Sequence, residues 1–286
     1  MKANKKNLYK DVEFLTSMNP ARNYQQLQAL NKAANYISDA FRELGNAEED
    51  QVFKVNGENY RNIRLLYGKE EQERVVVGAH YDVCGDQPGA DDNASGVAGL
   101  LETARLLFSA RPKLPYAVEF VAYSLEEPPY FATDNMGSAV HAKYLHEQGV
   151  KVKYMICFEM IGYFSDEPNS QRFPDEAMRQ FYPNTGNFIV VVGKQGQEAF
   201  TRNMQHLMQQ HTTIDVQSVN LPIGMGLAGL SDHRNYWRYN VEAIMINDSS
   251  FLRNPHYHQK SDTIDTLDFD RMTAVVDGVY GALINL

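Results

Sequence analysis

Apolar and polar residues in the first 70 positions follow two different periods. A helical period runs through residues 21–44 and predicts an amphipathic helix that ends at Gly45. The sequence QVFKVNGENYRNIRLLYG then alternates apolar with polar residues around Asn56-Gly57, which is a strong hairpin signal. We therefore expect a surface helix followed by two antiparallel strands. The apolar positions of the helical stripe are Leu27, Leu30, Ala34, Ile37 and Phe41.

From residue 74 the pattern changes to short apolar runs that alternate with helical stretches. The runs RVVVGAH, YAVEFVAYS and KYMICF are separated by the helical sequences ASGVAGLLETARLLF and MGSAVHAKYLHEQ. Further on come the strands NFIVVVG, IDVQSVNL and VEAIMIND, a helix over residues 196–210 and a closing helix from about Asp268. Such alternation predicts an α/β fold, a three-layer α/β/α sandwich around a mixed, mostly parallel sheet with one antiparallel edge.

Length and composition are consistent with one domain over residues 1–286. A chain of 286 residues can fold around a single sheet, and there is no repeat, low-complexity tract or linker that marks a boundary. Hydrophobic residues make up 43% and charged residues 22%, so a sizeable core can form and wholesale disorder is not expected.

The charge pattern narrows the range of partners. The formal net charge is -9, and no block of Lys and Arg interrupts the acidity, so we expect neither a nucleic-acid nor a membrane partner. No apolar stretch is long enough to cross a bilayer. A peptide or other small substrate fits better, and the sequence gives no indication of an oligomeric state.

The sequence MKANKKNLYKDVEF lacks the apolar run of a signal peptide. As it stands the chain would be cytoplasmic, and it would be periplasmic or secreted if a leader had been trimmed. Cys84 and Cys157 have no spacing typical of a zinc knuckle or a redox pair, so we expect two reduced thiols.

Metal-capable residues recur where the predicted strands end. Ligands bind at the carboxyl ends of the strands in such sheets, because loops there gather side chains from distant parts of the chain. The residues in these positions are His80 and Asp82 after RVVVGAH, Asp91 and Asp92 in GADDNASG, Glu126 and Glu127 after YAVEFVAYS, Glu159 after KYMICF, and His258 in NPHYHQKSDTID.

Two histidines and several carboxylates are ligands that suit zinc. A pair of ions would need one bridging carboxylate, with one histidine and one further carboxylate for each ion. Each motif taken alone has a simpler explanation, since an Asp-Asp pair in a glycine-rich turn is usually turn chemistry and Glu126-Glu127 could be an exposed acidic loop. The recurrence at successive strand ends favours a metal site.

The chain also resembles a known family. The strings GAHYDV, GADDNASGVAGLLETARLL, EE followed by MGS, FEMIG, SDH and YHQKSDTIDTLD are similar to those of the co-catalytic dizinc aminopeptidases. The resemblance runs from about residue 74 to the C-terminus and implies the zinc-exopeptidase fold, which resembles that of the phosphorylase/hydrolase group. The same fold serves glutamate carboxypeptidases and the single-zinc glutaminyl cyclases.

This resemblance implies roles for seven residues and two zinc ions. His80, Glu127, Glu159 and His258 correspond to zinc ligands, and Asp91 corresponds to the bridging ligand. Asp82 resembles the carboxylate that orients the first imidazole, and Glu126 resembles the general base that takes a proton from water and passes it to the leaving amine. The implied activity is that of a metallopeptidase, specifically an aminopeptidase.

Two features depart from the family pattern. Glu159 stands where the aminopeptidases usually carry Asp, and PPYFATDN replaces a shorter link after the two glutamates. Neither change removes a ligand, but both bear on substrate preference and metal stoichiometry. The aromatic residues Tyr236, Trp237 and Tyr257, together with Met225, are candidates for an apolar pocket, and His233 in SDH could position substrate or order a loop.

Several other functions compete with this one. Carboxypeptidase or glutaminyl-cyclase activity is compatible with the same fold, and a catalytically inactive binding module would be expected to lack some of the ligands. The string GMGLAG at residues 224–229, with Asp248 downstream, fits a dinucleotide-binding motif, but its strand–helix context is weak. No G-x-S-x-G elbow of a serine hydrolase is present.

Overall fold

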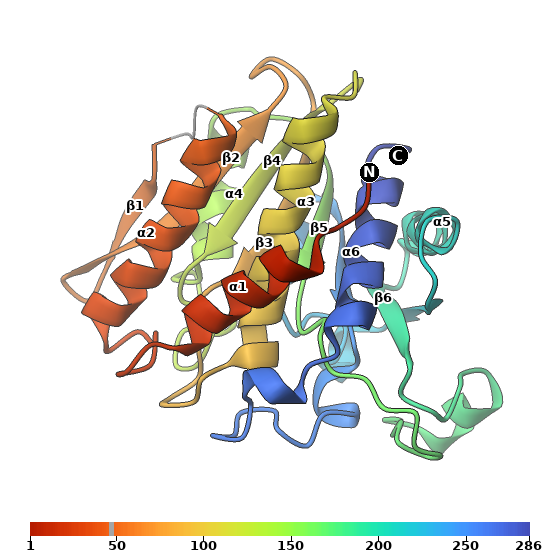
Figure 1. The fold of residues 1–286 in the computed structure, drawn as a ribbon. Helices are drawn as coiled ribbons and strands as arrows, with labels where there is room; N and C mark the ends of the chain where they lie inside the picture. The colour runs from red at the N-terminus through yellow and green to blue at the C-terminus, as the bar shows by residue number, and fades with distance from the viewer. Residues whose placement is uncertain (46–48) are drawn as a thin grey trace.

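The computed structural model describes residues 1–45 and 49–286, except for the side chain of Met225 (Figure 1). Within these residues the chain forms one eight-stranded sheet in the order β1-β2-β4-β3-β5-β8-β6-β7. The strands are β1 (Gln51–Val55), β2 (Glu58–Tyr67), β3 (Arg74–His80), β4 (Ala117–Tyr123), β5 (Val152–Phe158), β6 (Phe188–Lys194), β7 (Asp215–Leu221) and β8 (Glu242–Asn247).

The sheet is mixed and mostly parallel at its centre, as the sequence predicts. β3 pairs in parallel with β4 and β5, β5 pairs in parallel with β8, and β6 pairs in parallel with β7. Hairpin β1–β2 forms an antiparallel edge and joins β4 antiparallel through β2. A third antiparallel pairing, between β6 and β8, was not expected. Because these two strands run in opposite directions, the amino end of β6 lies beside the carboxyl end of β8.

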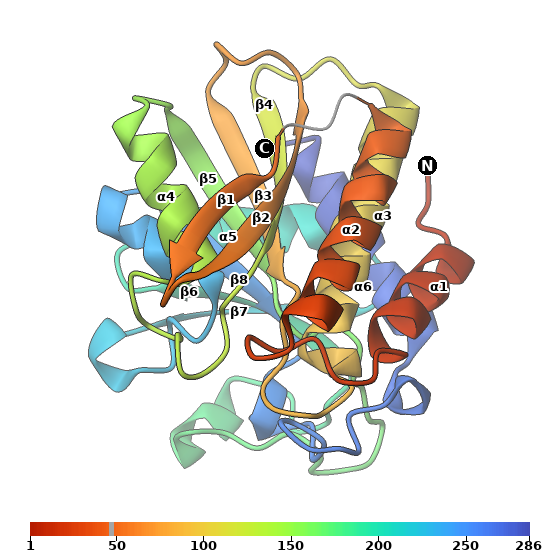
Figure 2. The ribbon, with the colours of Figure 1, turned by 90° about the vertical axis from the view of Figure 1, so that its left-hand side faces the viewer.

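Helices cover both faces of this sheet (Figure 2). Five helices pack on one face and share its core: α1 (Lys5–Thr16), α2 (Leu27–Leu44), α3 (Gly96–Ala110), α5 (Glu198–Gln209) and α6 (Phe269–Leu283). Helix α4 (Gly137–Glu147) and the 3-10 segment η4 (Asp232–Tyr239) pack on the other face. The shorter helical segments are η1 (Ala90–Ser95), η2 (Glu176–Gln180), η3 (Ile223–Met225), η5 (Ser250–Leu252) and η6 (Ile264–Thr266).

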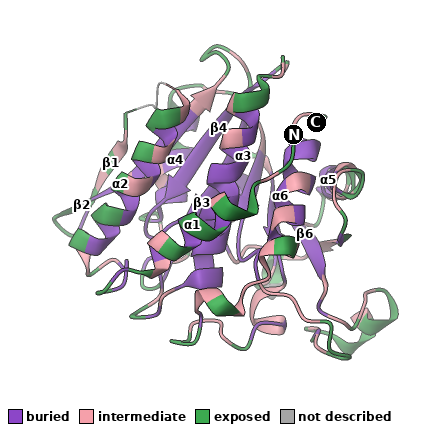
Figure 3. Ribbon diagram, in the orientation of Figure 1, coloured by how far each residue is buried: buried purple, intermediate pink, exposed green. Residues whose placement is uncertain are grey.

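The apolar run of β3 explains why this strand is central. Val75 and Val77 belong to the core under α3, whereas Val76 belongs to the core on the opposite face, so both faces of the strand are buried. Alternate side chains of a strand point to opposite faces, and a strand covered on both sides therefore needs a continuous apolar run. Figure 3 shows the central strands buried and the outer surfaces of the helices exposed.

Local sequence also explains the hairpin and the start of α2. Asn56 and Gly57 both have positive φ, 50° and 91°, as a two-residue hairpin turn requires. Helix α2 begins at Leu27 and not near residue 21, because Asn23 Oδ1 accepts hydrogen bonds from the backbone nitrogens of Gln25 and Gln26. Across the described residues the helices are too short or too polar to traverse a lipid bilayer.

The architecture gathers four loops at one edge of the sheet. Strands β3, β4, β5 and β8 run in the same direction, so their carboxyl ends lie together. The loops that follow these strands meet at the lower edge of the molecule as drawn in Figure 1. This edge is where the sequence predicts the metal-capable side chains.

Candidate metal centre

His80, the last residue of β3, is surrounded by carboxylates. Its Nε2 atom lies 3.2 Å from Glu159 Oε2, 3.4 Å from Asp92 Oδ1 and 3.9 Å from Glu126 Oε2. All four side chains are buried. We call His80, Asp92 and Glu159 the first subsite.

His258 forms a second group on the other side of Asp92. Its Nε2 atom lies 3.1 Å from Asp92 Oδ2 and 3.3 Å from Glu127 Oε2. We call Asp92, Glu127 and His258 the second subsite. The backbone of His258 is left-handed, with φ of 56°, a costly conformation that is often found at functional sites. Asp92 therefore presents one oxygen to each subsite.

Asp91, the residue assigned by the sequence as the bridging ligand, points elsewhere. Its Oδ1 accepts a hydrogen bond of 2.9 Å from the backbone nitrogen of Gly162, and its Oδ2 accepts one of 2.7 Å from Asn254 Nδ2. Burial and the neighbouring Asp248 raise the pKa of Asp91 well above its ordinary value. Both oxygens are thus engaged away from the histidines, and Asp92 is the aspartate whose oxygens lie between His80 and His258.

Asp82 lies where the sequence predicts an orienting carboxylate. Its Oδ1 is 3.5 Å from His80 Nδ1, at the outer limit of a hydrogen bond. The same side chain accepts hydrogen bonds of 3.1 Å from the backbone nitrogens of both Glu126 and Glu127. Asp82 therefore contacts the imidazole of the first subsite and fixes the backbone of the two glutamates.

Asp262 fixes the backbone of Asp91 and Asp92 in the same way, and the sequence analysis does not identify this residue. Its Oδ1 accepts a hydrogen bond of 2.9 Å from the backbone nitrogen of Asp91, and its Oδ2 accepts one of 3.1 Å from that of Asp92. Asp262 is fully buried and lies four residues after His258. A carboxylate so close in the chain to a predicted ligand is the one available sequence signal.

The SDH motif, residues 231–233 at the start of η4, positions one of the metal-capable residues and orders a nearby loop. Ser231 Oγ donates a hydrogen bond of 2.6 Å to Glu159 Oε2, so this serine orients a carboxylate of the first subsite. His233 Nε2 lies 2.7 Å from the backbone oxygen of Ala228, and burial lowers the pKa of His233 to about 4. A neutral His233 that donates to this carbonyl orders the loop, which agrees with the structural one of its two predicted roles.

The electrostatics of the cluster fit the binding of cations. Burial raises the pKa of Glu126 and Glu159, and burial together with Asp92 raises the pKa of Glu127 to about 7. Among the described residues, both ring nitrogens of His80 and the Oε1 atoms of Glu126 and Glu127 are buried without a hydrogen-bond partner. Buried polar atoms are rarely left unsatisfied. Nitrogen and oxygen donors in this arrangement are what zinc requires.

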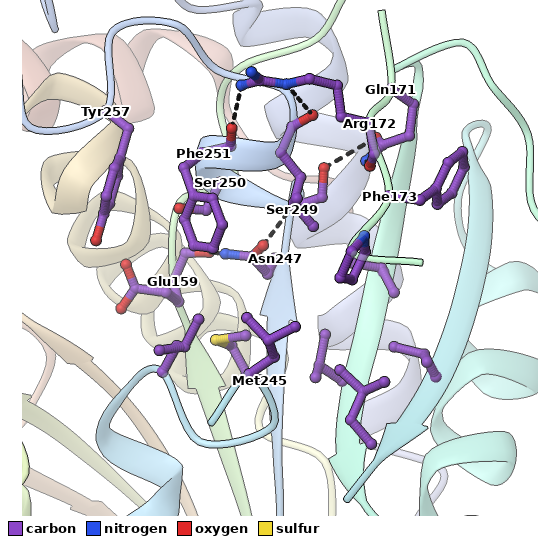
Figure 4. A pocket seen from close by; sticks show the side chains of 18 of the residues that line it. Glu159, Gln171, Arg172, Phe173, Met245, Asn247, Ser249, Ser250, Phe251 and Tyr257 are labelled. Atoms are coloured by element: carbon purple, nitrogen blue, oxygen red, sulfur yellow. Dashed lines mark hydrogen bonds between the residues drawn. The ribbon is translucent and has the colours of Figure 1, made fainter. Parts of the chain in front are cut away.

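An apolar pocket opens beside the two subsites (Figure 4). Its volume is about 940 Å³, including the open space at its mouth. In the view of Figure 4, Glu159 and Tyr257 lie on one side of the pocket and Phe173 lies on the opposite side. Its apolar walls come mainly from β6, β7, β8 and the segment before β6: Phe173, Met178, Tyr182, Phe188, Val190, Val192, Val219, Leu221, Leu227, Leu230 and Met245.

The other residues suggested for such a pocket have different positions. Tyr257 lines it, as predicted, whereas Tyr236 and Trp237 are buried in the core under α4. The side chain of Met225 lies outside the described part of the structure. The glycines of GMGLAG are followed by the 3-10 segment η4 and not by an α-helix, so the context of a dinucleotide-binding motif is missing.

Comparison with protein families and curated proteins agrees with this geometry. The model of Peptidase family M28 matches residues 62–283. The chain is 42% identical to the uncharacterized protein YfbL of Escherichia coli strain K12, over 99% of this chain and 88% of YfbL. It is 26% identical to a probable leucine aminopeptidase of Trichophyton verrucosum, over 94% of this chain and 69% of that protein.

Solved structures share the fold. The LapA aminopeptidase of Legionella pneumophila superposes with a TM-score of 0.80 at 21% identity, over 99% of this chain and 72% of LapA. A glutaminyl cyclase of Porphyromonas gingivalis superposes with a TM-score of 0.73 at 18% identity, over 98% of each chain. At these identities the likeness establishes the α/β/α architecture.

Proposed function

Since the chain belongs to peptidase family M28 and is a metallopeptidase, we propose that it is a zinc aminopeptidase that holds two ions and releases apolar N-terminal residues from peptides. The observation that carries this proposal is the position of Asp92, whose two oxygens face His80 and His258 separately. One carboxylate between two histidine-containing subsites is the arrangement that a pair of metal ions needs.

The two subsites provide matching sets of ligands. His80, Asp92 and Glu159 would hold one ion, and Asp92, Glu127 and His258 would hold the other. Bound zinc supplies Lewis-acid chemistry, because it polarises a carbonyl and lowers the pKa of water. The unpartnered buried atoms of His80 and Glu127 support this assignment among the described residues.

Glu126 is positioned to move protons. Its Oε2 lies 3.9 Å from His80 Nε2, and its Oε1 is buried without a partner among the described residues. As general base its carboxylate takes a proton from the attacking water, and as general acid it then returns that proton to the nitrogen of the leaving amine. Asp82 holds the backbone of Glu126, so the carboxylate keeps its place beside the first subsite.

The charges around the pocket favour a substrate amine over a substrate carboxylate. Four carboxylate residues line the pocket where it meets the subsites: Asp92, Glu126, Glu127 and Glu159. Arg172, a cation in the lining, is exposed and donates hydrogen bonds to the backbone oxygens of Phe251 and Leu252. With Asp92, Glu127 and Glu159 bound to zinc, Glu126 is the carboxylate of these four that is left to accept a hydrogen bond from a free N-terminal amine, while Arg172 is engaged with backbone oxygens.

The walls of the pocket favour an apolar side chain on the N-terminal residue. Val190, Val192, Val219 and Met245 present hydrocarbon to the cavity. Complete burial of a leucine-sized side chain contributes about 1.5–3 kcal/mol. Peptides that begin with large apolar residues should therefore have the highest kcat/KM.

The proposal is tested by zinc analysis of the purified protein together with hydrolysis of a matched peptide panel. Each peptide is supplied with a free N-terminus and with an acetylated N-terminus, and the panel includes N-terminal Leu, Ala, Glu and Gln. We expect release of the first residue from free peptides only, fastest for Leu. Release of C-terminal residues, cleavage of the acetylated series, or cyclisation of N-terminal Gln without hydrolysis would each contradict the proposal.

A further inference from the structure

A thiol lies at the second subsite, where neither the sequence nor the family resemblance assigns a role to it. Cys84 Sγ, one carboxylate oxygen of Glu127 and one ring nitrogen of His258 all lie within 4.8 Å of one another. Cys84 is half-buried, and the other two residues are already placed in the second subsite. Sulfur, nitrogen and oxygen donors are all zinc ligands.

The loop that carries Cys84 is held rigidly from the N-terminal part of the chain. Asn23 Nδ2 donates a hydrogen bond of 2.6 Å to the backbone oxygen of Gly85, the residue that follows the cysteine. The buried Arg22 donates from Nε to the backbone oxygen of Tyr81, at 2.9 Å. The thiol is thus presented from a loop anchored on both sides, which is how a protein positions a metal ligand.

A second observation points to a ligand at this place. Glu127 is only 4% exposed, and its Oε1 atom has no hydrogen-bond partner among the described residues. Asp92, Glu127 and His258 supply three donors to the second subsite, one fewer than a closed tetrahedral zinc site contains. The Cys84 Sγ atom lies within 4.8 Å of donor atoms of two members of this set, Glu127 and His258, and can therefore supply the fourth donor.

We propose that Cys84 is the fourth protein ligand of the cation at the second subsite, bound through Sγ as a thiolate. The inference rests on the proposed function, because it presumes the pair of cations. As the sulfur–metal bond forms, the thiol proton leaves to solvent. A sulfur ligand makes the second subsite softer than the first, so the second subsite selects zinc or cadmium over manganese and magnesium.

This assignment gives the two subsites different roles. A zinc site with four protein ligands is closed, whereas one with three keeps a position for water or substrate. The first subsite has three ligands and lies beside Glu126, the proposed base. Catalysis is therefore centred on the first subsite, and the second subsite fixes Asp92 and contributes charge.

The first test measures thiol alkylation with iodoacetamide, followed by peptide mapping, on the wild-type protein. In protein stripped by a chelator, Cys84 should be labelled, and in protein reloaded with two zinc ions its labelling should slow by about tenfold or more, because a metal-bound thiolate is a poor nucleophile. Cys157, which is fully buried, provides an internal control and should stay unlabelled in both forms. Equal labelling of Cys84 with and without zinc would overturn the proposal.

The second test separates ligation from simple shielding of the thiol. Protein loaded with cobalt(II) should show a sulfur-to-cobalt charge-transfer band in the near ultraviolet. The band should disappear in Cys84→Ser and persist in Cys157→Ala. A cobalt-loaded wild type without the band, or a band that survives in Cys84→Ser, would refute sulfur ligation even if zinc slowed labelling.

These readouts do not depend on turnover, so the two proposals can fail separately. A protein that binds two zinc ions and hydrolyses peptides but leaves Cys84 freely reactive would overturn only the assignment of Cys84. A protein that shows the cobalt–sulfur band and the protected thiol but does not hydrolyse free peptides would support the assignment of Cys84 and overturn the aminopeptidase proposal.

Discussion

The Oδ2 atom of Asp262 accepts a hydrogen bond of 3.1 Å from the backbone nitrogen of Asp92. Asp82 makes equivalent bonds to the backbone nitrogens of Glu126 and Glu127. In both cases a buried carboxylate from another part of the chain fixes two consecutive acidic residues through their backbone. The direction of each metal-capable side chain therefore depends on an aspartate that is not proposed to touch the metal.

Asp262→Asn should weaken the centre without removing a ligand. The amide nitrogen of the new side chain would face a backbone N–H and leave one buried donor unsatisfied, which costs about 1–3 kcal/mol of stability. We expect weaker zinc binding and a lower kcat/KM, measured by competition with a chelator and by peptide hydrolysis. Asp265→Asn, an exposed change three residues away, is the control and should leave both unchanged. Wild-type zinc affinity in Asp262→Asn would contradict this role.

The substitution Asp92→Asn should lower the zinc content, whereas Asp91→Asn should leave it unchanged. Asp92→Asn removes the carboxylate between the two histidines, so zinc should fall below two ions per chain and hydrolysis should be lost. Asp91→Asn leaves the proposed ligands of both subsites in place, because the Asp91 oxygens contact Gly162 and Asn254 and not the histidines, so zinc content should be retained. Mass spectrometry of the metal content checks both variants. Loss of zinc from Asp91→Asn with full retention in Asp92→Asn would restore the assignment made from the sequence.

Glu126→Gln should separate chemistry from metal binding. The amide keeps the size of the side chain but cannot accept the proton of water, so kcat should fall by about 10²–10⁴-fold. Zinc content should be unchanged, because the ligands of both subsites are intact. Steady-state kinetics and metal analysis on the same preparation provide the measurement. Turnover at the wild-type rate would remove Glu126 as the base.

Val192→Phe should reduce the space for the N-terminal side chain. Val192 lies on β6, is buried and lines the apolar pocket. We expect kcat/KM for peptides that begin with Leu to drop by about tenfold, with a smaller effect on peptides that begin with Ala. Val52→Phe is the control, because Val52 is 61% exposed on β1. An equal loss for both classes of peptide would argue that the pocket does not bind this side chain.

Glu119, which is not part of the proposed metal centre, should make the free energy of unfolding depend on pH. It is buried on β4 with Oε2 2.7 Å from Arg74 Nη1 and Oε1 3.2 Å from His141 Nε2. Although burial opposes its charge, His141 and Arg74 lower the pKa of Glu119 from the ordinary 4.5 to about 2. Since the folded pKa is the lower one, this contribution to stability is present above pH 4.5 and is lost as the pH falls towards 2.

Denaturant unfolding of wild type and Glu119→Gln over this pH range checks the expectation. Near neutral pH the variant should be less stable by about 3–5 kcal/mol, because the buried Arg74 loses its partner. The difference between the two proteins should shrink as the pH is lowered. Glu58→Gln, an exposed change on β2, should show no such difference. A difference independent of pH would contradict the shifted pKa.

The sequence predicts the fold and the edge of the sheet that carries the site, because strand periodicity is local and the carboxyl ends of parallel strands must lie together. It does not distinguish Asp91 from Asp92. Inside the segment Ala90–Ser95 the backbone at Asp92 leaves the helical region, with φ of -103° and ψ of 91°, and Asp262 from 170 residues further along the chain fixes that path. Such a contact has no local signature.

Other features were missed for different reasons. Helix α1 is absent from the predicted elements, although Leu8, Val12 and Leu15 stand at helical spacing and are buried. Ser231 acts through one hydrogen bond to Glu159 across 72 positions. The antiparallel step between β6 and β8 depends on the order of strands in the sheet, which periodicity does not report. The identities of the zinc ligands stay predictions.

That antiparallel step places the hydrolytic groups and the walls of the pocket on different parts of the sheet. The proposed ligands follow β3, β4, β5 and β8, whereas β6 and β7, beyond the step, supply Phe188, Val190, Val192, Val219 and Leu221 to the apolar wall of the pocket. Changes in β6 or β7 can therefore alter which peptide is accepted while the reactive groups keep their geometry. Mutations in such a scaffold can change substrate selectivity while the residues that carry out hydrolysis stay the same.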